Sequence, residues 1–245
     1  MKEFQVKTKE SFFDNFLRRI ARTFKRKPKF TNLNDGEDLR GRDLPKRCLL
    51  IGNHNGAGGA FSYRTFMKKR FMTWGAYQML GNFKSRRQYL YHVLYRQKLG
   101  WNKVRAAIVS FLFGIMSKRF YKVAGIIPTY PDSRVRQTFK YSMQCLESDI
   151  PVFIFPENSN EGYKPQIEEF WSGFIHFSEL YYRRHNEDLP IYTCYYQKKP
   201  KTIVIGKPMF LQELKKEHSE EEIMNIFKDY MNSLRDHVPN AKKAK

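Results

Sequence analysis

Short apolar runs separated by helical patterns constrain the fold of this chain more than any other feature. Residues 48–52 (CLLIG) and 150–155 (IPVFIF) are almost wholly apolar, which is typical of strands buried on both faces of a sheet. Further strand candidates are 123–130 (VAGIIPTY), 190–196 (PIYTCYY) and 201–209 (KTIVIGKPM). Strands that alternate with helical segments predict an α/β fold, with a mixed, mostly parallel central sheet flanked by helices.

Helical periodicity marks the segments between these strands. A basic helix is expected from about 61 to 72, and two helices rich in aromatic and basic residues at 84–98 and 102–121. Later helices are expected after 130, around 165–184 and from 219 to about 236. The apolar face of the helix after 130 consists of Val135, Phe139, Met143 and Leu146.

The first 45 residues differ from the rest in composition. In residues 11–27 (SFFDNFLRRIARTFKRK), aromatic and aliphatic side chains recur at helical spacing beside a row of arginines and lysines. This pattern suits an amphipathic helix at an anionic membrane surface, and equally a helix docked on the protein's own core. A polar linker at 31–45 follows. We therefore expect a membrane-surface helix and linker at 1–45 and an α/β domain at 46–245.

Positive charge is unevenly distributed along the chain. The net charge is +21, and the 88 residues between Asp43 and Asp132 contain 16 Lys and Arg but no Asp or Glu. Such a span repels itself unless it meets an anionic partner, such as a lipid surface, a nucleic acid or a phosphorylated substrate. Its interleaved aromatic residues suit the headgroup level of a membrane. They would also suit single-stranded nucleic acid, but no RNA-recognition, OB-fold or zinc signature favours that partner.

Several functional classes are disfavoured by the sequence. Cys48, Cys145 and Cys194 lack metal or redox spacing, which indicates a reducing compartment without structural disulfides. The six histidines show no metal-ligand spacing, so no metal or other cofactor is expected. The N-terminus lacks the apolar core of a signal peptide, and the apolar segment 106–117 is shorter than the roughly 18 residues of a spanning helix. Membrane contact is therefore expected to be peripheral or re-entrant.

A histidine in a glycine-rich turn is the first candidate for chemistry. The segment 53–61 (NHNGAGGAF) follows the apolar run 48–52 and precedes a helix, where functional loops of α/β sheets lie. Histidine is the usual general base near neutral pH, so His54 is a candidate base, with a structural or capping histidine as the alternative. The turn lacks the Gly-Lys-Ser/Thr of a phosphate-binding P-loop. Phe61 stands where a dinucleotide fingerprint requires glycine.

Four segments in order resemble the sequence blocks of the glycerolipid acyltransferase superfamily. They are IGNHNGAGG, GIIPTYPDSRVR, VFIFPENSNEG and LPIYTCYYQ with IVIGKPM, and they span roughly residues 46–210. The resemblance implies transfer of a fatty acyl group from acyl-CoA or acyl carrier protein to the hydroxyl of a lysophospholipid or related glycerolipid. It also implies a peripheral location at the cytoplasmic face of a membrane, with the acyl thioester as co-substrate.

The resemblance assigns roles to individual residues. His54 corresponds to the base that removes the acceptor's hydroxyl proton, and Phe155, Pro156 and Glu157 correspond to the loop that helps to hold the acceptor phosphate. Arg134 or Arg136 matches the arginine of the second block. The remaining expected substrate-binding positions are Asn53, Gly58, Gly59, Asn158 and Ser159.

The chain departs from the superfamily pattern at the aspartate that orients the base. Gly59 occupies that position, and no residue from 44 to 131 can supply a carboxylate instead. Glu157 is the leading replacement because it follows another expected central strand; Asp132, Glu161 and Asp43 come next.

A backbone carbonyl or Asn55 could instead fix the imidazole tautomer. A second departure places Asn158, Ser159 and Asn160 where the superfamily has Gly-Thr-Arg. Losing the orienting carboxylate costs a Ser-His-Asp enzyme about 10⁴ in rate. Two functions therefore stay open: an active acyltransferase, and an inactive relative that binds lipid or acyl thioester.

Overall fold

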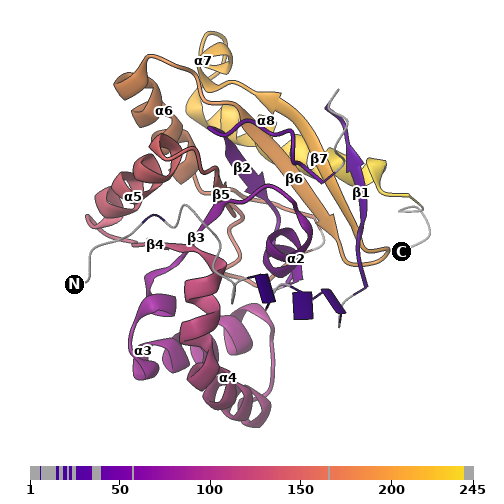
Figure 1. Cartoon of the computed structure of the whole chain (residues 1–245), viewed down its shortest axis with the longest axis vertical. Helices are drawn as coiled ribbons and strands as arrows, with labels where there is room; N and C mark the ends of the chain where they lie inside the picture. Colours follow the sequence, from indigo (N-terminus) through magenta and orange to yellow (C-terminus); the bar gives the residue numbers. More distant parts are fainter. Residues whose placement is uncertain are drawn as a thin grey trace.

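A seven-stranded sheet with helices on both faces forms the body of the protein, and a helical extension lies below it (Figure 1). The computed structural model describes residues 6, 15–16, 19–20, 22–23, 26–34, 40–56, 58–164 and 166–239. The strands are β1 (Lys29–Asn32), β2 (Leu49–Gly52), β3 (Met72–Ala76), β4 (Ile126–Thr129), β5 (Val152–Ile154), β6 (Ile191–Gln197) and β7 (Thr202–Met209).

The helices fall into two groups. Those around the sheet are α2 (Gly58–Phe66), α5 (Val135–Glu147), α6 (Gly173–His185), α7 (Leu211–Leu214), α8 (Glu220–Ser233) and η3 (Leu234–His237). Those of the extension are η1 (Tyr77–Leu80), α3 (Phe83–Gln88), the π-helix η2 (Tyr89–Lys98) and α4 (Lys103–Ala124).

The strand order is β1-β7-β6-β2-β5-β3-β4, and the sheet is mostly parallel. β6 and β7 run antiparallel, whereas the other five pairings among the described strands are parallel. The sequence-based prediction of a mixed, mostly parallel α/β fold is therefore confirmed. The carboxyl ends of β2, β5 and β6 consequently meet at one edge of the sheet, which is where α/β proteins build their sites.

Side chains of the central strands alternate between two buried cores. Leu49 and Ile51 of β2 join the core under α5, α6 and α8, whereas Leu50 between them joins the core under α2. Val152 and Phe153 of β5 divide in the same way. This alternation explains why the strands appear in the sequence as continuous apolar runs: both of their faces are buried.

Sequence periodicity was wrong about two segments of the body. The helix expected at 61–72 ends at Phe66, and its last predicted residue, Met72, begins strand β3. The helix expected at 165–184 begins only at Gly173, because the chain first makes a long loop after β5. Basic and aromatic side chains at 68–76 hid the strand, since they lack the apolar pattern of a buried one.

The boundary region near residue 45 also differs from the prediction. Lys29–Asn32 forms strand β1, which pairs in parallel with β7, so the sheet includes residues on both sides of the expected division at 45. The predicted linker 31–45 thus begins inside a strand. Most of the predicted N-terminal amphipathic helix lies outside the described residues. Among the helices that the structure describes, none has the length and apolarity needed to cross a bilayer.

Candidate functional site

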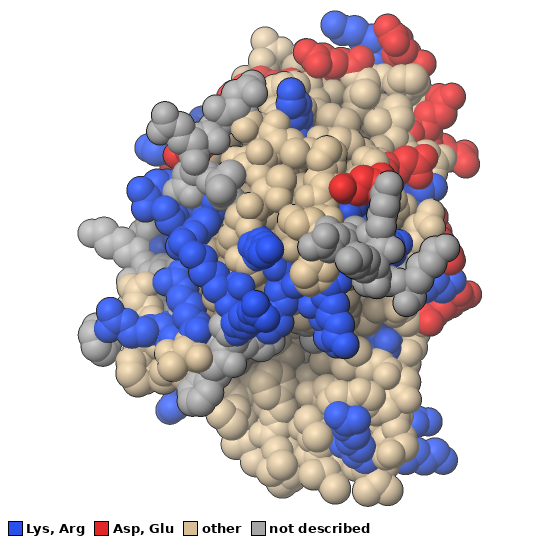
Figure 2. Space-filling model, turned by 90° about the vertical axis from the view of Figure 1, so that its right-hand side faces the viewer, with Lys and Arg blue, Asp and Glu red and all other residues tan. Residues whose placement is uncertain are grey.

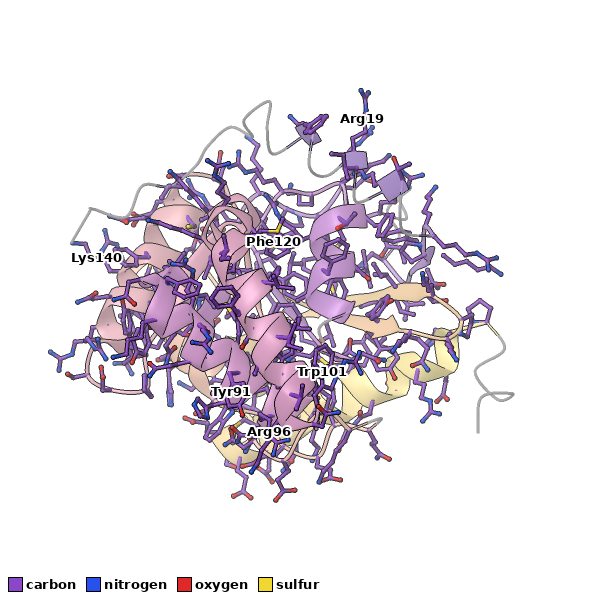
Figure 3. All side chains as sticks on the ribbon, turned by 90° about the horizontal axis from the view of Figure 1, so that it is seen from below. Arg19, Tyr91, Arg96, Trp101, Phe120 and Lys140 are labelled. Atoms are coloured by element: carbon purple, nitrogen blue, oxygen red, sulfur yellow. The ribbon has the colours of Figure 1, made fainter. Side chains whose placement is uncertain are left out.

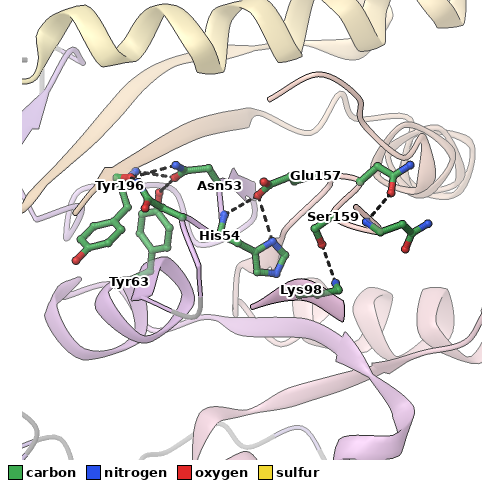
Figure 4. Close-up of polar contacts among 10 residues, drawn as sticks. Asn53, His54, Tyr63, Lys98, Glu157, Ser159 and Tyr196 are labelled. Carbon is green, nitrogen blue, oxygen red and sulfur yellow. Dashed lines mark hydrogen bonds and ion pairs between the residues drawn. The ribbon is translucent and has the colours of Figure 1, made fainter. Parts of the chain in front are cut away.

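His54 and Glu157 meet at the carboxyl ends of two neighbouring strands. Ile51 of β2 is paired with Ile154 of β5, and each candidate residue lies three positions beyond its member of that pair. Glu157 is buried, and its Oε2 accepts a hydrogen bond of 2.9 Å from the backbone N–H of His54. The same oxygen lies 3.4 Å from the imidazole Nδ1 (Figure 4). Glu157 is thus the carboxylate beside His54, as the sequence reasoning proposed.

The contact between the ring and the carboxylate is loose. Nδ1 of His54 is buried, and its separation of 3.4 Å from Oε2 does not make a well-formed hydrogen bond. The stronger bond of Glu157 is the one from the His54 backbone N–H. The main structural role of the carboxylate is therefore to hold the turn, and its contact with the imidazole ring is weaker. Catalytic hydrogen bonds are often long in the absence of substrate and tighten when it binds.

Burial and charge set the protonation state of His54. Burial lowers the pKa of His54 below its ordinary 6.5, and nearby Lys98 lowers it further, while Glu157 opposes both by favouring the imidazolium. The ring is packed against the rings of Phe155 and Tyr163, with centroids 4.5 and 5.1 Å away. The imidazole is therefore neutral at pH 7, as a general base must be before it accepts a proton.

Asn53 anchors the turn rather than facing a substrate. Its Oδ1 accepts hydrogen bonds from the Tyr196 N–H at 2.7 Å and the Tyr63 hydroxyl at 3.0 Å. Its Nδ2 and the Nδ2 of Asn55 both donate to the Tyr196 carbonyl at 3.0 Å. These bonds tie the end of β2 to β6 and α2. Both lone pairs of the Asn53 oxygen are used inside the protein, and Asn55 bonds to β6 rather than fixing the imidazole.

The backbone of the turn leaves no space for a side chain at position 59. Gly58 and Gly59 begin α2, and the N–H of Gly59 donates to the His54 carbonyl at 2.8 Å. A Cβ at position 59 would lie 2.3 Å from the carbonyl oxygen of His54 and 2.6 Å from that of Asn53. The turn as folded has no room for any side chain at position 59. A carboxylate for His54 must therefore come from another strand.

Lys98 is a site residue that the sequence reasoning missed. Its ammonium donates a 2.7 Å hydrogen bond to the Oγ of Ser159, from the end of η2 to the loop after β5. It lies 5.7 Å from the centre of the Tyr163 ring. Burial lowers the pKa of Lys98, while Glu157 acts in the opposite direction. Lys98 is one of 16 basic residues in the acid-free span, and no spacing signal singles it out.

The loop after β5 is held in place by its own backbone. Pro156 is buried, and its carbonyl accepts a 2.7 Å hydrogen bond from the Trp171 N–H. Asn158 donates from its backbone to the Glu169 carbonyl at 3.0 Å and from its side chain to the Glu169 carboxylate at 2.6 Å. The structure therefore brings Phe155, Glu157 and Ser159 to His54, while the side chain of Asn158 is occupied by Glu169.

Neither candidate arginine contacts the His54 cluster in the described part of the chain. Arg134 donates to both oxygens of Asp132, at 2.9 and 2.7 Å, and lies over the rings of Tyr77 and Tyr130. Hydrogen bonds from Arg134 lower the pKa of Asp132 to about 2. Arg136 is exposed and borders a groove between α5 and α6.

The other carboxylates weighed as partners of His54 do not reach it. Asp132 is engaged by Arg134, as described above, and Glu161 forms an exposed ion pair with Lys164 at 3.1 Å. Asp43 lies exposed on the segment before β2. Among the residues that the structure describes, no three His, Cys, Asp or Glu side chains are grouped so that they could hold a metal ion.

Comparison with known proteins does not place the chain in a family. No protein-family model matches it, and no curated protein matches it.

Proposed function

We propose that the protein is a peripheral membrane acyltransferase. It would move a fatty acyl group from acyl-CoA or acyl carrier protein to the hydroxyl of a lysophospholipid or related glycerolipid, at the cytoplasmic face of a membrane. The observation that carries the proposal is the His54–Glu157 pair, with Nδ1 and Oε2 3.4 Å apart at adjacent strand ends. It occurs in the two segments whose sequences resemble the acyltransferase blocks.

The pair supports general-base chemistry. With the Nδ1 proton directed at Glu157, the lone pair of Nε2 accepts the acceptor's hydroxyl proton as that oxygen attacks the thioester carbonyl. The imidazolium formed in this step is stabilised by the Glu157 carboxylate. When the tetrahedral intermediate collapses, the C–S bond breaks and the imidazolium returns the proton to the departing thiolate.

Lys98 supplies positive charge beside the base. Its ammonium is held by Ser159 and contributes to the electrostatics of both His54 and Glu157. A partly buried lysine binds phosphate as a point charge and is less hydrated there than at an open surface. We propose that Lys98, rather than Arg134 or Arg136, meets the phosphate of the acceptor.

One observation favours the alternative of an inactive lipid-binding or acyl-thioester-binding protein. Nδ1 of His54 has no well-formed hydrogen bond, although it is buried. If the ring and Glu157 do not close on each other when substrate binds, the imidazolium lacks its stabilising partner. The protein would then keep the positive charge of Lys98 beside His54 but would not catalyse transfer.

A transfer assay separates the two functions. The purified protein is incubated with labelled acyl-CoA or acyl carrier protein and a panel of lysolipids. The wild type is compared with His54→Ala and Glu157→Gln. We expect His54→Ala to abolish transfer and Glu157→Gln to reduce it by up to about 10⁴-fold, the loss seen when a triad loses its carboxylate. No product from the wild type with either donor would contradict the acyltransferase proposal and favour the inactive binding protein.

The chain offers a matched control for this pair. His176 and Glu220 lie 3.5 Å apart, nearly the same separation, but both are about half exposed. We expect His176→Ala and Glu220→Gln to leave transfer unchanged. If Glu157→Gln also left it unchanged while His54→Ala abolished it, Glu157 would not be the orienting carboxylate.

A further inference from the structure

Helix α4 presents a long apolar face to solvent. Six of its apolar side chains are between 47% and 71% exposed and recur at spacings of one, three and four residues, which gathers them along one side of the helix. They are Val104, Ile108, Phe111, Leu112, Ile115 and Met116. We call these six residues the α4 apolar face. Figure 3 looks at the molecule from below, with α4 toward the viewer between the labelled Trp101 and Phe120.

The opposite side of α4 is already buried. Ala106, Ser110, Gly114, Ser117 and Tyr121 recur at spacings of three and four residues and are all buried. At Gly114 the helix approaches α3 so closely that a Cβ would lie 3.1 Å from the Phe83 ring. The α4 apolar face is therefore not the side that holds the helix to the protein. A large exposed apolar patch normally marks a site of interaction with another molecule or with a membrane.

Basic residues flank the α4 apolar face at both ends. Lys103 and Arg105 lie on either side of its first residue, Val104, and Lys118 and Arg119 follow its last residue, Met116; all four are exposed. No acid accompanies them, because the whole extension lies within the acid-free span 44–131. Figure 2 shows a band of Lys and Arg across the body above a lower part with little acidic surface. Aromatic partners lie there too: the Arg105 guanidinium is 4.0 Å from the centre of the Trp101 ring.

We propose that the α4 apolar face inserts into an anionic lipid bilayer, with α4 lying in the plane of the interface. Apolar side chains enter the boundary between headgroups and acyl chains, while lysine and arginine at the two ends reach lipid phosphates. A second copy of this chain fits less well. Packing α4 against α4, in either direction, brings basic ends together with no carboxylate in the span to neutralise them.

The same extension supplies a residue to the candidate site. Lys98 ends η2 five residues before α4 begins, and it bonds to Ser159 beside His54. A bilayer bound at α4 would thus contact the same extension that places Lys98 in the candidate site. This arrangement suits an acceptor lipid that enters the site from the membrane. This inference deepens the proposed membrane association and rests on it. Vesicle binding, however, is measured without any acyl donor.

Vesicle flotation tests whether the α4 apolar face binds an anionic bilayer. The probes are phosphatidylcholine vesicles with and without phosphatidylglycerol, at low and high salt. We expect tighter binding to the anionic vesicles, weakened by salt. Ile108→Ser combined with Ile115→Ser should weaken binding at least about tenfold, since two partly buried isoleucines are lost from the interface. Leu180→Ser, at an apolar side chain of α6 that is 41% exposed, serves as control and should bind as the wild type does.

Insertion is distinguished from surface attraction by fluorescence. Leu112→Trp should shift its emission to the blue and be quenched by brominated lipid, whereas Leu180→Trp should show neither change. Circular dichroism and thermal unfolding check that each variant is folded. Equal vesicle binding by the double serine variant and the wild type would overturn the proposal. So would a dimer in lipid-free light scattering that the double variant converts to monomer, because the face would then bind a second copy.

Failure of this inference is separable from failure of the proposed chemistry. His54→Ala should bind vesicles as the wild type does, whatever its transfer activity. The double serine variant should still acylate a short-chain lysolipid supplied as monomers in solution. Absence of transfer by a wild type that binds vesicles normally contradicts the acyltransferase proposal alone. Equal vesicle binding by the double serine variant and the wild type, with normal transfer, contradicts the α4 proposal alone.

Discussion

At the scale of single residues, the turn from 53 to 59 shows how one backbone conformation determines where a carboxylate can lie. The carbonyl oxygens of Asn53 and His54 point into the space that a side chain at Gly59 would need. The turn can therefore close tightly onto α2 only with glycine there. Glu157 faces His54 from the neighbouring strand and also receives the His54 backbone N–H. In this fold the carboxylate nearest to His54 therefore lies at the sheet edge and not on α2.

The first residue-scale prediction concerns the space at Gly59. Gly59→Ala should destabilise the protein by about 2–4 kcal/mol, because its Cβ would lie 2.3 Å from a backbone oxygen and the turn must shift. Gly58→Ala is the control: its Cβ would meet Tyr196 at an ordinary 3.5 Å, so its effect should stay within about 1 kcal/mol. Urea unfolding measures both. Equal stability of the two variants would contradict the crowded turn.

The second residue-scale prediction concerns the charge balance of His54. Burial and Lys98 lower its pKa and Glu157 raises it, so Lys98→Met should raise the pKa and Glu157→Gln should lower it. NMR titration of the imidazole measures these shifts without any substrate. In the wild type, kcat/KM should fall as pH drops below 6.5 through the pKa of His54, since the protonated ring cannot act as base. Identical pKa values in all three proteins would contradict the described contacts.

At the scale of elements, the extension is joined internally by one buried arginine. The guanidinium of Arg86 in α3 donates to the Ser117 hydroxyl at 3.0 Å and the Gly114 carbonyl at 3.1 Å, both in α4, and to the carbonyl of Gly81. No acid of the surrounding span is available to pair with it. Its charge is satisfied by carbonyl and hydroxyl dipoles, which fixes α3 against the buried side of α4.

An element-scale prediction follows for Arg86. Arg86→Met should destabilise the packing of α3 on α4 by about 2–4 kcal/mol, since it removes the hydrogen bonds from the guanidinium to Ser117, Gly114 and Gly81. Arg87→Met changes the exposed neighbouring arginine and should cost no more than about 0.5 kcal/mol. Hydrogen exchange, followed separately for 83–124 and for the sheet, measures the effect. Unchanged exchange in 83–124 of the Arg86 variant would contradict the structural role of Arg86.

At the scale of the whole molecule, the cysteines report on the two cores of the sheet. Cys48 and Cys194 lie in the core under α2, and Cys145 of α5 lies in the other. All three are free and buried. Burial raises the pKa of the Cys48 and Cys145 thiols to about 12, and it raises that of Cys194 as well. Since the thiolate is the reactive form, the folded protein should protect all of them.

The whole-molecule prediction is that the three thiols become reactive together. In native buffer, alkylation should be at least about 10³-fold slower than in urea, because it requires opening of the fold. Mass spectrometry after a labelling pulse at increasing urea should show unlabelled and triply labelled protein, with few partly labelled molecules. Early labelling of Cys145 alone would show instead that the core under α5, α6 and α8 opens independently.

The fold class, the positions of the central strands and His54 as a candidate base could all be predicted from local sequence pattern. Continuous apolar runs identify strands buried on both sides, and those runs place His54 and Glu157 beyond strand ends. The acid-free span also showed that a carboxylate for His54 had to come from elsewhere in the chain. These inferences need only local sequence. A strand buried on both faces is a continuous apolar run, and functional loops of α/β sheets follow the carboxyl ends of such strands.

Contacts between residues far apart in the sequence could not be predicted in this way. Strands β1 and β3 lack a buried apolar pattern, and they become strands because β7, β4 and β5 offer them backbone partners. Lys98 lies at the end of a π-helix that no sequence spacing predicts, and there it donates a hydrogen bond to Ser159. Arg134 instead forms an ion pair with Asp132. The exposed side of α4 is more apolar than its buried side, which consists of Ala106, Ser110, Gly114, Ser117 and Tyr121. Which side faces solvent depends on where α3 packs, and that contact exists only after the chain has folded.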